Sequence, residues 1–538
     1  MNYTNPIIPG FYPDPSICRV GEDYYLVTSS FEYFPGVPIF HSRDLYNWRQ
    51  IGYVLNRPAQ LPLDKSPISC GIFAPTLRYH AGRFYMITTN VSFGGNFLVT
   101  ATDPAGPWSA PVAVDSPGID PSLTFDGDGT CYITGNWCDD GRGGKGIGVA
   151  RIDAASGKLL EPMRFIWSGT GGQHAEGPHL YHIGRWWYLL IAEGGTELCH
   201  MITIARSESP YGPFESCPHN PILTHRSLPS RIHSIGHSDL VQDHRGNWWM
   251  VFLGTRHSLF MYPTRHHLGR ETFLAPVTWT NGDSGVTEVT RPTDLGWPVI
   301  NAGRPIELQM DVPAALPAHP FPPTPTRDDF DSPQYAMSWN WLRNPVIENY
   351  SLTQRPGWLT LKGSAVTPDA EDSPTLICRR QQHFNCRAAA LLDFVPAAEN
   401  EEAGVSVRMN DRHHYDLAVT MRGGKRCAIV RQRIGDIFQE TACQPLPDGP
   451  VELSIEATRD TYSFAAHGDP LRVSPCHPED GKGVIPLGKA STAYLTSEAA
   501  GGFTGVMIAL YATGWGKPCT ATAAFDWFDY IPLPDDER

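Results

Sequence analysis

One short plan recurs five times in the N-terminal part of this chain. In each unit a short polar or proline-containing motif precedes a Gly-containing turn, and an aromatic, apolar run follows, most clearly at 24–28, 84–88, 186–191 and 248–252. The motifs lie near residues 14, 74, 120, 177 and 237, about 46 to 60 residues apart. Even spacing with one aromatic motif per unit is typical of β-propeller blades. The sequence therefore predicts a five-bladed β-propeller over residues 1–305.

Helices contribute little to this part of the chain. We find no clear run of apolar residues at i, i+3, i+4, i+7 before residue 300, whereas a TIM barrel or a doubly wound sheet needs amphipathic helices between its strands. Only 18% of the residues are charged and 11% are aromatic, with 51 Gly and 49 Pro among 538 residues. This composition fits a loop-rich, all-β protein of two or three domains.

A proline-rich stretch at 306–326 follows the propeller and is expected to run as a stiff, extended linker. Beyond it, short alternating runs separated by turn residues predict a β-sandwich over residues 327–538. The last of these runs, 523–530, alternates as an edge or closing strand would.

The net charge and the cysteines limit the function classes and the compartment. A formal net charge of −14 does not favour binding to nucleic acid or to an anionic membrane, whereas a neutral sugar is indifferent to it. No stretch of 18 apolar residues predicts a membrane span, and the first residues lack the pattern of a signal peptide. The 12 Cys form no CxxC pair and are expected to be free and buried. We therefore expect a cytoplasmic protein.

Three of the five motifs contain an acid directly before Pro or Gly-Pro: Asp14, Asp120 and Glu176. Asp-Pro opens many turns, so such an acid taken alone is more often structural than catalytic. Equivalent places in three repeated units would bring the three carboxylates to one axis. Carboxylates that converge in this way are a glycosidase-like arrangement.

Several longer motifs resemble glycoside hydrolase family 43, and in particular its two-domain β-xylosidases. They occur in the family's order along essentially the whole chain, at 12–16, 30–45, 176–181, 192–196 and 269–272. The resemblance implies a five-bladed propeller and a concanavalin-like jelly-roll sandwich that closes the active-site pocket. It also implies an inverting exo-enzyme that releases xylose from the non-reducing ends of β-1,4-xylo-oligosaccharides, often with α-L-arabinofuranosidase activity.

The resemblance gives each acid a role. Asp14 matches the family's general base, which activates water, and Glu176 matches the general acid, which protonates the leaving oxygen. Inversion requires roughly 6.5–9.5 Å between these two carboxyl groups so that water fits. Asp120 matches a third carboxylate that orients the acid and raises its pKa through like charge. Arg270 matches an arginine that pairs with the carboxylates and with sugar hydroxyls.

The resemblance also places substrate-binding side chains around the acids. Phe31 matches a residue that stacks on the sugar, and Phe503 matches one that the sandwich inserts to close the pocket. Phe73 stands where the family usually has Trp, which leaves a smaller stacking surface. His237 matches a histidine near the propeller centre; no cofactor is required, although calcium or a water could lie beside it.

The substrate stays open between related activities. A chain that is primarily an α-L-arabinofuranosidase would use the same acids, and a non-catalytic carbohydrate-binding propeller is the alternative from another class. The expected partner is a xylo-oligosaccharide or an arabinosyl-oligosaccharide, and an exposed sandwich face would support a homodimer or homotetramer. Asp126, Asp128 and Asp239 are interpreted as lying outside the site, the first two as hairpin-turn residues.

Overall fold

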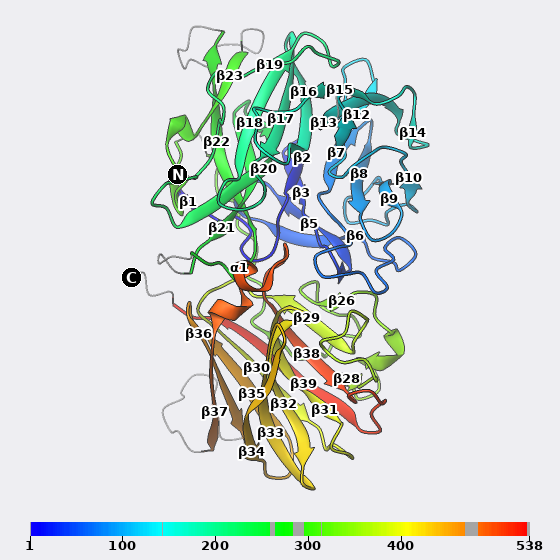
Figure 1. Cartoon of the computed structure of the whole chain (residues 1–538), viewed down its shortest axis with the longest axis vertical. Helices are drawn as coiled ribbons and strands as arrows, with labels where there is room; N and C mark the ends of the chain where they lie inside the picture. The colour runs from blue at the N-terminus through cyan, green and yellow to red at the C-terminus, as the bar shows by residue number, and fades with distance from the viewer. Residues whose placement is uncertain are drawn as a thin grey trace.

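The computed structural model describes residues 2–141, 144–258, 264–282, 295–313, 315–468 and 483–534. Figure 1 shows two β-rich bodies joined end to end, the N-terminal body above the C-terminal one. The chain is nearly all β, as predicted. The helical elements of the described residues are short: η2 (Asn301–Gly303), η3 (Ile347–Asn349), η6 (Thr492–Leu495) and α1 (Ser497–Ala500).

The N-terminal body is a five-bladed propeller, which confirms the prediction from the repeats. The first blade consists of β2 (Ser16–Val20), β3 (Asp23–Val27), β5 (Gly36–Ser42) and β6 (Arg49–Leu55). The second consists of β7 (Thr76–His80), β8 (Arg83–Asn90), β9 (Gly95–Ala101) and β10 (Val112–Ala113). The third consists of β11 (Ser122–Phe125), β12 (Cys131–Asp139) and β13 (Lys145–Asp153), with β14 (Lys158–Leu159) and β15 (Arg164–Trp167) both paired to β13.

The last two blades complete a closed ring. The fourth consists of β16 (Glu176–Ile183), β17 (Trp186–Glu193), β18 (Met201–Ser207) and β19 (Glu215–Ser216). The fifth consists of β20 (Ile232–Gln242), β21 (Trp248–Arg256), β22 (Glu271–Asn281) and β23 (Leu295–Ile300). The innermost strands contact one another in the order β2, β7, β11, β16, β20 and back to β2. The ring therefore brings the five repeated motifs to one axis.

The C-terminal body is a sandwich of two antiparallel sheets, as predicted. One sheet contains, in spatial order, β27 (Tyr350–Ser351), β28 (Leu359–Lys362), β39 (Thr522–Pro532), β30 (Cys386–Asp393), β35 (Val451–Ala457), β36 (Thr461–His467) and β37 (Val484–Ser491), with β25 (Arg327–Asp328) on β39. The other contains β34 (Ile437–Pro445), β33 (Lys425–Ile434), β32 (His413–Arg422), β31 (Glu402–Asn410), β38 (Met507–Thr513), β29 (Leu376–Arg380), β26 (Asn340–Leu342) and β4 (Tyr33–Phe34).

The final strand, β39, does not lie at an edge. We expected 523–530 to form an edge or closing strand, but Phe525 pairs with Leu359 of β28 on one side and with Leu392 of β30 on the other. The alternating pattern requires only that one face of a strand is buried. It therefore does not distinguish a central strand from an edge strand.

Two strand pairings fix the bodies to each other and to the segment between them. Strand β4 (Tyr33–Phe34) leaves the first blade and pairs with β26, so that it extends a sheet of the sandwich. Strand β1 (Asn2–Thr4) pairs with β24 (Gln309–Asp311), which lies within the proline-rich segment 306–326. Leu316 of that segment is fully buried. The segment therefore packs against the propeller instead of spanning free space.

The cysteines of the described residues are all free, and most of them are buried, as expected. None of the helices in the described ranges is long and apolar enough to cross a bilayer. Packing and backbone pairing thus hold this part of the chain together without cross-links.

Candidate active site

The three acids lie at equivalent places on the propeller axis. Asp14 and Asp120 each stand shortly before an innermost strand, β2 or β11, and Glu176 is the first residue of β16. Asp14 and Asp120 share an uncommon backbone, with φ of 55° in both. Asp tolerates this left-handed conformation better than most residues do. The backbone therefore turns in the same way at both positions, and each turn directs a carboxyl group toward the axis.

The acids line one cavity of 120 Å³. Its lining consists of Asp14, Phe31, Phe73, Ala74, Ile119, Asp120, Glu176, Thr196, His200, His237, Arg270 and Phe503. Every site residue predicted from the sequence lies in this lining. A wider depression of 530 Å³ lies between the outer strands β10 and β14, away from the axis, and its lining contains none of these residues.

Asp14 is a buried carboxylate next to a cation. Nη1 of Arg270 donates to Oδ1 of Asp14 at 3.1 Å, the Ser29 hydroxyl donates to Oδ2, and Nδ1 of His237 lies 3.7 Å from Oδ1. Burial alone would raise the pKa of Asp14. Arg270, His237 and the Ser29 hydrogen bond outweigh burial, so the pKa of Asp14 lies below its ordinary value. Asp14 is therefore ionised at neutral pH.

Glu176 and Asp120 hold their protons more tightly. Burial, followed by the charge of Asp14, raises the pKa of Glu176 to about 7, although Arg270 opposes the shift. Burial raises the pKa of Asp120 well above its ordinary value, and the charges of Glu176 and Asp14 raise it further. The backbone N–H of Gly177 donates to Asp120 at 3.2 Å and partly offsets this. The pKa values of both carboxyl groups are therefore raised, and the protonation of each depends on that of the other.

The interaction between Asp120 and Glu176 is mutual. The charge of Glu176 raises the pKa of Asp120, and by the same repulsion an ionised Asp120 disfavours ionisation of Glu176. Asp120 is only 6% exposed, so burial also disfavours its own ionisation. Its direct structural link is the hydrogen bond to Gly177, which fixes the backbone beside Glu176.

Arg270 connects the acids to the cavity wall. Its guanidinium lies 5.5 Å from the ring centres of both Phe31 and Phe503. It also donates to the Phe503 carbonyl at 3.4 Å and to the Thr196 hydroxyl at 3.1 Å. Thr196 and His200 line the cavity, and our sequence-based assignment does not include them. The available signal for Thr196 was its place at the end of the motif 192–196; His200 has no comparable signal.

Three phenylalanines from separate parts of the chain form the aromatic wall. The ring centres of Phe31 and Phe73 lie 5.3 Å apart, those of Phe31 and Phe503 5.9 Å, and those of Phe73 and Phe503 6.1 Å. Phe503 comes from the sandwich and is 39% exposed. The wall therefore exists only when the two bodies are docked.

His237 lies in β20 and lines the cavity beside Asp14. Burial lowers the pKa of His237, so its imidazole is neutral at pH 7. Calcium takes six to eight oxygen ligands, and one imidazole next to one carboxylate does not make up such a set. His237 and Asp14 would therefore supply only two of the ligands that a calcium ion beside His237 needs.

A further buried carboxylate, Asp239, lies on the same inner strands but outside the cavity lining. It accepts hydrogen bonds from Arg78 at 2.8 Å, from the Tyr181 hydroxyl at 2.6 Å and from the Ser16 hydroxyl at 2.7 Å. Arg78 also contacts His179 at 2.9 Å. Burial would raise the pKa of Asp239, but Arg78 and the other donors hold it well below its ordinary value. We call these five residues the axis cluster.

The other two acids assigned to structure lie in a surface turn. Asp126 and Asp128 follow β11, where the N–H of Gly129 donates to the Asp126 carbonyl at 3.0 Å. Oδ1 of Asp126 pairs with His182 of the next blade at 2.7 Å. Neither acid lines the cavity, which agrees with their interpretation as hairpin-turn residues.

Known sequences with the same two-part organisation match this chain. The family model of glycosyl hydrolases family 43 matches residues 3–284, and that of the beta xylosidase C-terminal concanavalin A-like domain matches residues 327–531. A Bacteroides ovatus protein named non-reducing end alpha-L-arabinofuranosidase BoGH43B is 45% identical over 98% of this chain and 94% of its own length. A xylosidase/arabinosidase of Butyrivibrio fibrisolvens is 40% identical over 97% of this chain and 98% of its own.

Solved structures match over the same extent. Bacteroides ovatus xyloglucan PUL GH43B superposes with a TM-score of 0.89 at 44% identity, covering 99% of this chain and 100% of its own. A xylan beta-1,4-xylosidase from Bacillus halodurans superposes with a TM-score of 0.86 at 35% identity, covering 98% and 100%. The similarity therefore includes both bodies.

Proposed function

Because the chain belongs to glycosyl hydrolase family 43 and is a glycoside hydrolase, we propose that it is an inverting exo-enzyme of the β-xylosidase kind. Its substrate would be the non-reducing end of β-1,4-xylo-oligosaccharides, with α-L-arabinofuranosidase activity as well. The observation that carries this proposal is the opposite protonation of two acids in one cavity. Asp14 is ionised beside Arg270, whereas Glu176 has a pKa of about 7.

The proposed reaction needs one base and one acid. Asp14 takes a proton from water as the water oxygen attacks the anomeric carbon, and Glu176 donates its proton to the glycosidic oxygen as the bond to the leaving sugar breaks. The products are one pentose of inverted anomeric configuration and the shortened oligosaccharide. Asp14 is then protonated and Glu176 ionised, and proton exchange with solvent restores both.

Asp120 and Arg270 would support this division of labour. Asp120 holds the backbone at Gly177 and thereby the position of Glu176. Arg270 keeps Asp14 ionised and lies between two aromatic rings of the wall, where it can also meet sugar hydroxyls. The same guanidinium would thus both keep the base ionised and help to position the sugar.

The shape of the cavity supports exo action. Phe503 enters from the sandwich, and its carbonyl accepts a hydrogen bond from Arg270 next to the base. A long chain would have to displace this contact to pass through, whereas a terminal unit can enter from one side. We therefore assign the 120 Å³ cavity to one terminal pentose.

Comparing two substrates and one variant tests the proposal. Wild type should hydrolyse xylobiose and nitrophenyl β-xyloside, and Asp14→Asn should lower kcat/KM on both by about 10²- to 10⁴-fold. Asp126→Asn, which changes an acid outside the cavity, is the matched control and should keep wild-type activity. Near-wild-type turnover in Asp14→Asn would contradict the proposal.

One relative favours a second candidate, a chain that is primarily an α-L-arabinofuranosidase. The Bacteroides ovatus protein at 45% identity carries that name. The ratio of kcat/KM on nitrophenyl α-L-arabinofuranoside to that on nitrophenyl β-xyloside decides between the two. A ratio above one favours the second candidate, and a ratio below one favours the first.

We also propose that the chain acts in a reducing compartment such as the cytoplasm. The support is the set of free, mostly buried cysteines in the described residues, which need no oxidising environment. Fractionation of cells that make the protein tests this. Enzyme activity recovered mainly outside the cytoplasmic fraction would contradict the proposal.

A further inference from the structure

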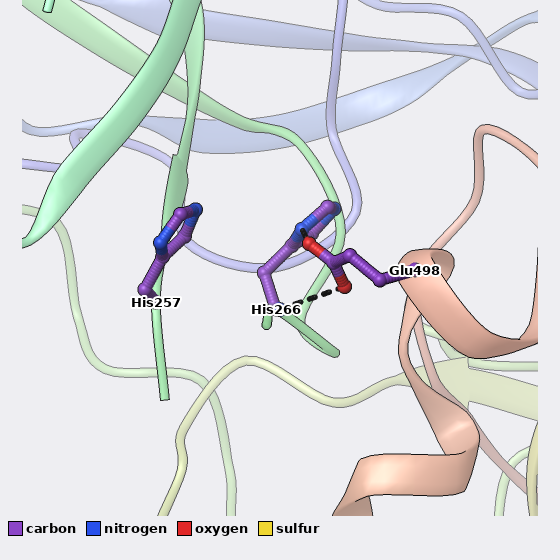
Figure 2. A group of neighbouring side chains, drawn as sticks. All are labelled: His257, His266 and Glu498. Atoms are coloured by element: carbon purple, nitrogen blue, oxygen red, sulfur yellow. Dashed lines mark hydrogen bonds and ion pairs between the residues drawn. The ribbon is translucent and has the colours of Figure 1, made fainter. Parts of the chain in front are cut away.

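Three metal-ligating side chains meet where the propeller contacts the sandwich, outside the cavity lining. His257 follows β21, His266 precedes β22, and Glu498 belongs to α1 of the sandwich. One ligand atom from each lies within 4.8 Å of the others, and within the described ranges this is the one such group of three. Figure 2 shows the two imidazole rings side by side, with the Glu498 carboxylate against His266.

Neighbouring groups hold these side chains in place. Oε1 of Glu498 lies 2.7 Å from Nδ1 of His266, and the backbone N–H of His266 donates to Oε2 at 3.2 Å. The His257 ring is nearly parallel to the His266 ring at 6.1 Å and to the His233 ring at 4.4 Å. A second partner that orients a ligand is characteristic of built metal sites.

His257 contributes a buried nitrogen that has no other use in the fold. The residue is 3% exposed, and within the part of the chain that the structure describes its Nδ1 has no hydrogen-bond partner. Buried polar atoms are nearly always paired, because an unpaired one costs stability. An ion bound at this group would give the His257 imidazole a partner.

We propose that His257, His266 and Glu498 bind one zinc ion. Two imidazoles and a carboxylate are a donor set that zinc accepts, whereas calcium and magnesium take mainly oxygen ligands. Tetrahedral zinc with ligands at about 2.0–2.2 Å holds its ligand atoms roughly 3.4 Å apart. The Nδ1–Oε1 contact of His266 and Glu498, at 2.7 Å, would therefore open by about 0.7 Å, and separations of up to 4.8 Å would close by up to about 1.4 Å. Zinc would take the place of the hydrogen between His266 and Glu498, with the neutral imidazole of His266 carrying its N–H on Nε2 instead, and water would be the fourth ligand.

Such a site would fasten the sandwich segment that reaches the pocket. The N–H of Ser497 donates to the His266 carbonyl at 3.3 Å, and the N–H of Val506 donates to the His267 carbonyl at 2.9 Å. Phe503 lies between these two points of attachment. A zinc ion at Glu498 would therefore hold the segment that carries Phe503 against the propeller, without contact to the substrate.

Zinc titration of the full chain after removal of metals by a chelator tests this inference. Isothermal calorimetry should find one tight zinc site per chain, and zinc should raise Tm by a few degrees. Glu498→Gln keeps the size and the polarity of a partly exposed side chain and should weaken zinc binding at least tenfold. His257→Gln should do the same. Calcium at the same concentration should not raise Tm.

His182→Gln is the matched control, because His182 pairs with Asp126 at 2.7 Å but belongs to no group of three among the described residues. It should bind zinc as wild type does. Wild-type zinc affinity in Glu498→Gln would overturn the inference, because the ion would then lie elsewhere. Failure of the wild-type chain to bind zinc would overturn it as well.

Discussion

The pocket and the axis cluster are built on the same inner strands, yet the buried carboxyl groups of the two regions differ in their hydrogen-bond donors and in the direction of their pKa shifts. Asp239 of the axis cluster accepts from an arginine, two hydroxyls and a backbone N–H. Among the described residues, Asp120 in the pocket accepts one hydrogen bond, from the backbone N–H of Gly177. The pKa of Asp239 accordingly lies well below its ordinary value, and that of Asp120 well above it.

This difference indicates that the axis cluster stabilises the fold, whereas the pocket acids take part in proton transfer. A carboxylate whose donors are complete stays in one protonation state, whereas an incompletely paired one can exchange a proton near neutral pH. The two sets are neighbours along the chain, since Ser16 follows Asp14 closely and Asp239 follows His237 closely. The axis cluster therefore supports the strands from which the pocket acids project.

The largest expected effect is on activity and comes from Glu176→Gln. The variant should lose about 10²- to 10⁴-fold in kcat/KM on xylobiose, because amide nitrogen cannot donate the required proton. The loss should be much smaller on dinitrophenyl β-xyloside, since its leaving group needs little protonation. Steady-state rates on both substrates measure this, and equal losses on the two would remove Glu176 from the role of acid.

The next effect is on stability and comes from the axis cluster. Asp239→Asn leaves Arg78 buried without its counter-charge and should lower the free energy of unfolding by about 3–5 kcal/mol. Turnover per folded molecule should stay within a few-fold of wild type. Asp126→Asn breaks a more exposed pair and should cost less than about 1 kcal/mol. Denaturant unfolding measures the stability of both variants. If Asp239→Asn loses turnover while its stability is unchanged, Asp239 belongs functionally to the pocket and the distinction between the two regions is wrong.

A smaller effect is expected at the aromatic wall. Phe503→Ala should lower kcat/KM by about tenfold, the size expected for one lost aromatic contact with the sugar. Phe438→Ala removes another partly exposed phenylalanine of the sandwich, and it should leave kcat/KM unchanged. If both variants behave alike in xylobiose hydrolysis, Phe503 has no part in the pocket.

The smallest expected effect is on stability and comes from Asp120. Replacing a buried residue usually destabilises a protein, whereas replacing Asp120 should stabilise it. The raised pKa of Asp120 means that the folded state binds its proton more tightly than the unfolded chain, so stability falls as pH rises above the ordinary Asp range. Asp120→Asn removes that penalty, so it should stabilise the chain relative to wild type at pH 8 and give no gain at pH 3. Thermal unfolding at both pH values checks this.

The same variant should also change the pH profile. Losing a neighbouring carboxyl group lowers the pKa of Glu176, so the alkaline fall of kcat/KM, expected near pH 7 in wild type, should move to lower pH. If activity falls but the alkaline limit does not move, Asp120 has no electrostatic effect on Glu176, and only its positioning contact with Gly177 remains.

Local signals were sufficient for the blades and for the acids. An aromatic run after each turn marks one strand, and Asp14 and Asp120 share both a following Pro and a backbone conformation. Neither signal depends on distant parts of the chain. The same holds for the alternating runs of the sandwich, although they leave the order of its strands open, as the interior position of β39 shows.

Contacts between distant segments could not be predicted in this way. His266 and Glu498 lie 232 positions apart and on different bodies, and neither is part of a recognisable motif. His200 reaches the cavity from a loop without a repeated pattern. The balance of charges around Asp120 also depends on burial, which only the closed ring of blades creates.

In the proposed reaction Asp14 acts on water and not on the sugar itself. Proton NMR of xylobiose during the first minutes of hydrolysis reports which anomer of xylose forms before mutarotation. α-Xylose should appear first, because water attacks from the face opposite the β-linked leaving group. If β-xylose appears first, the configuration is retained through a covalent intermediate, and the assignment of Asp14 as a base is contradicted.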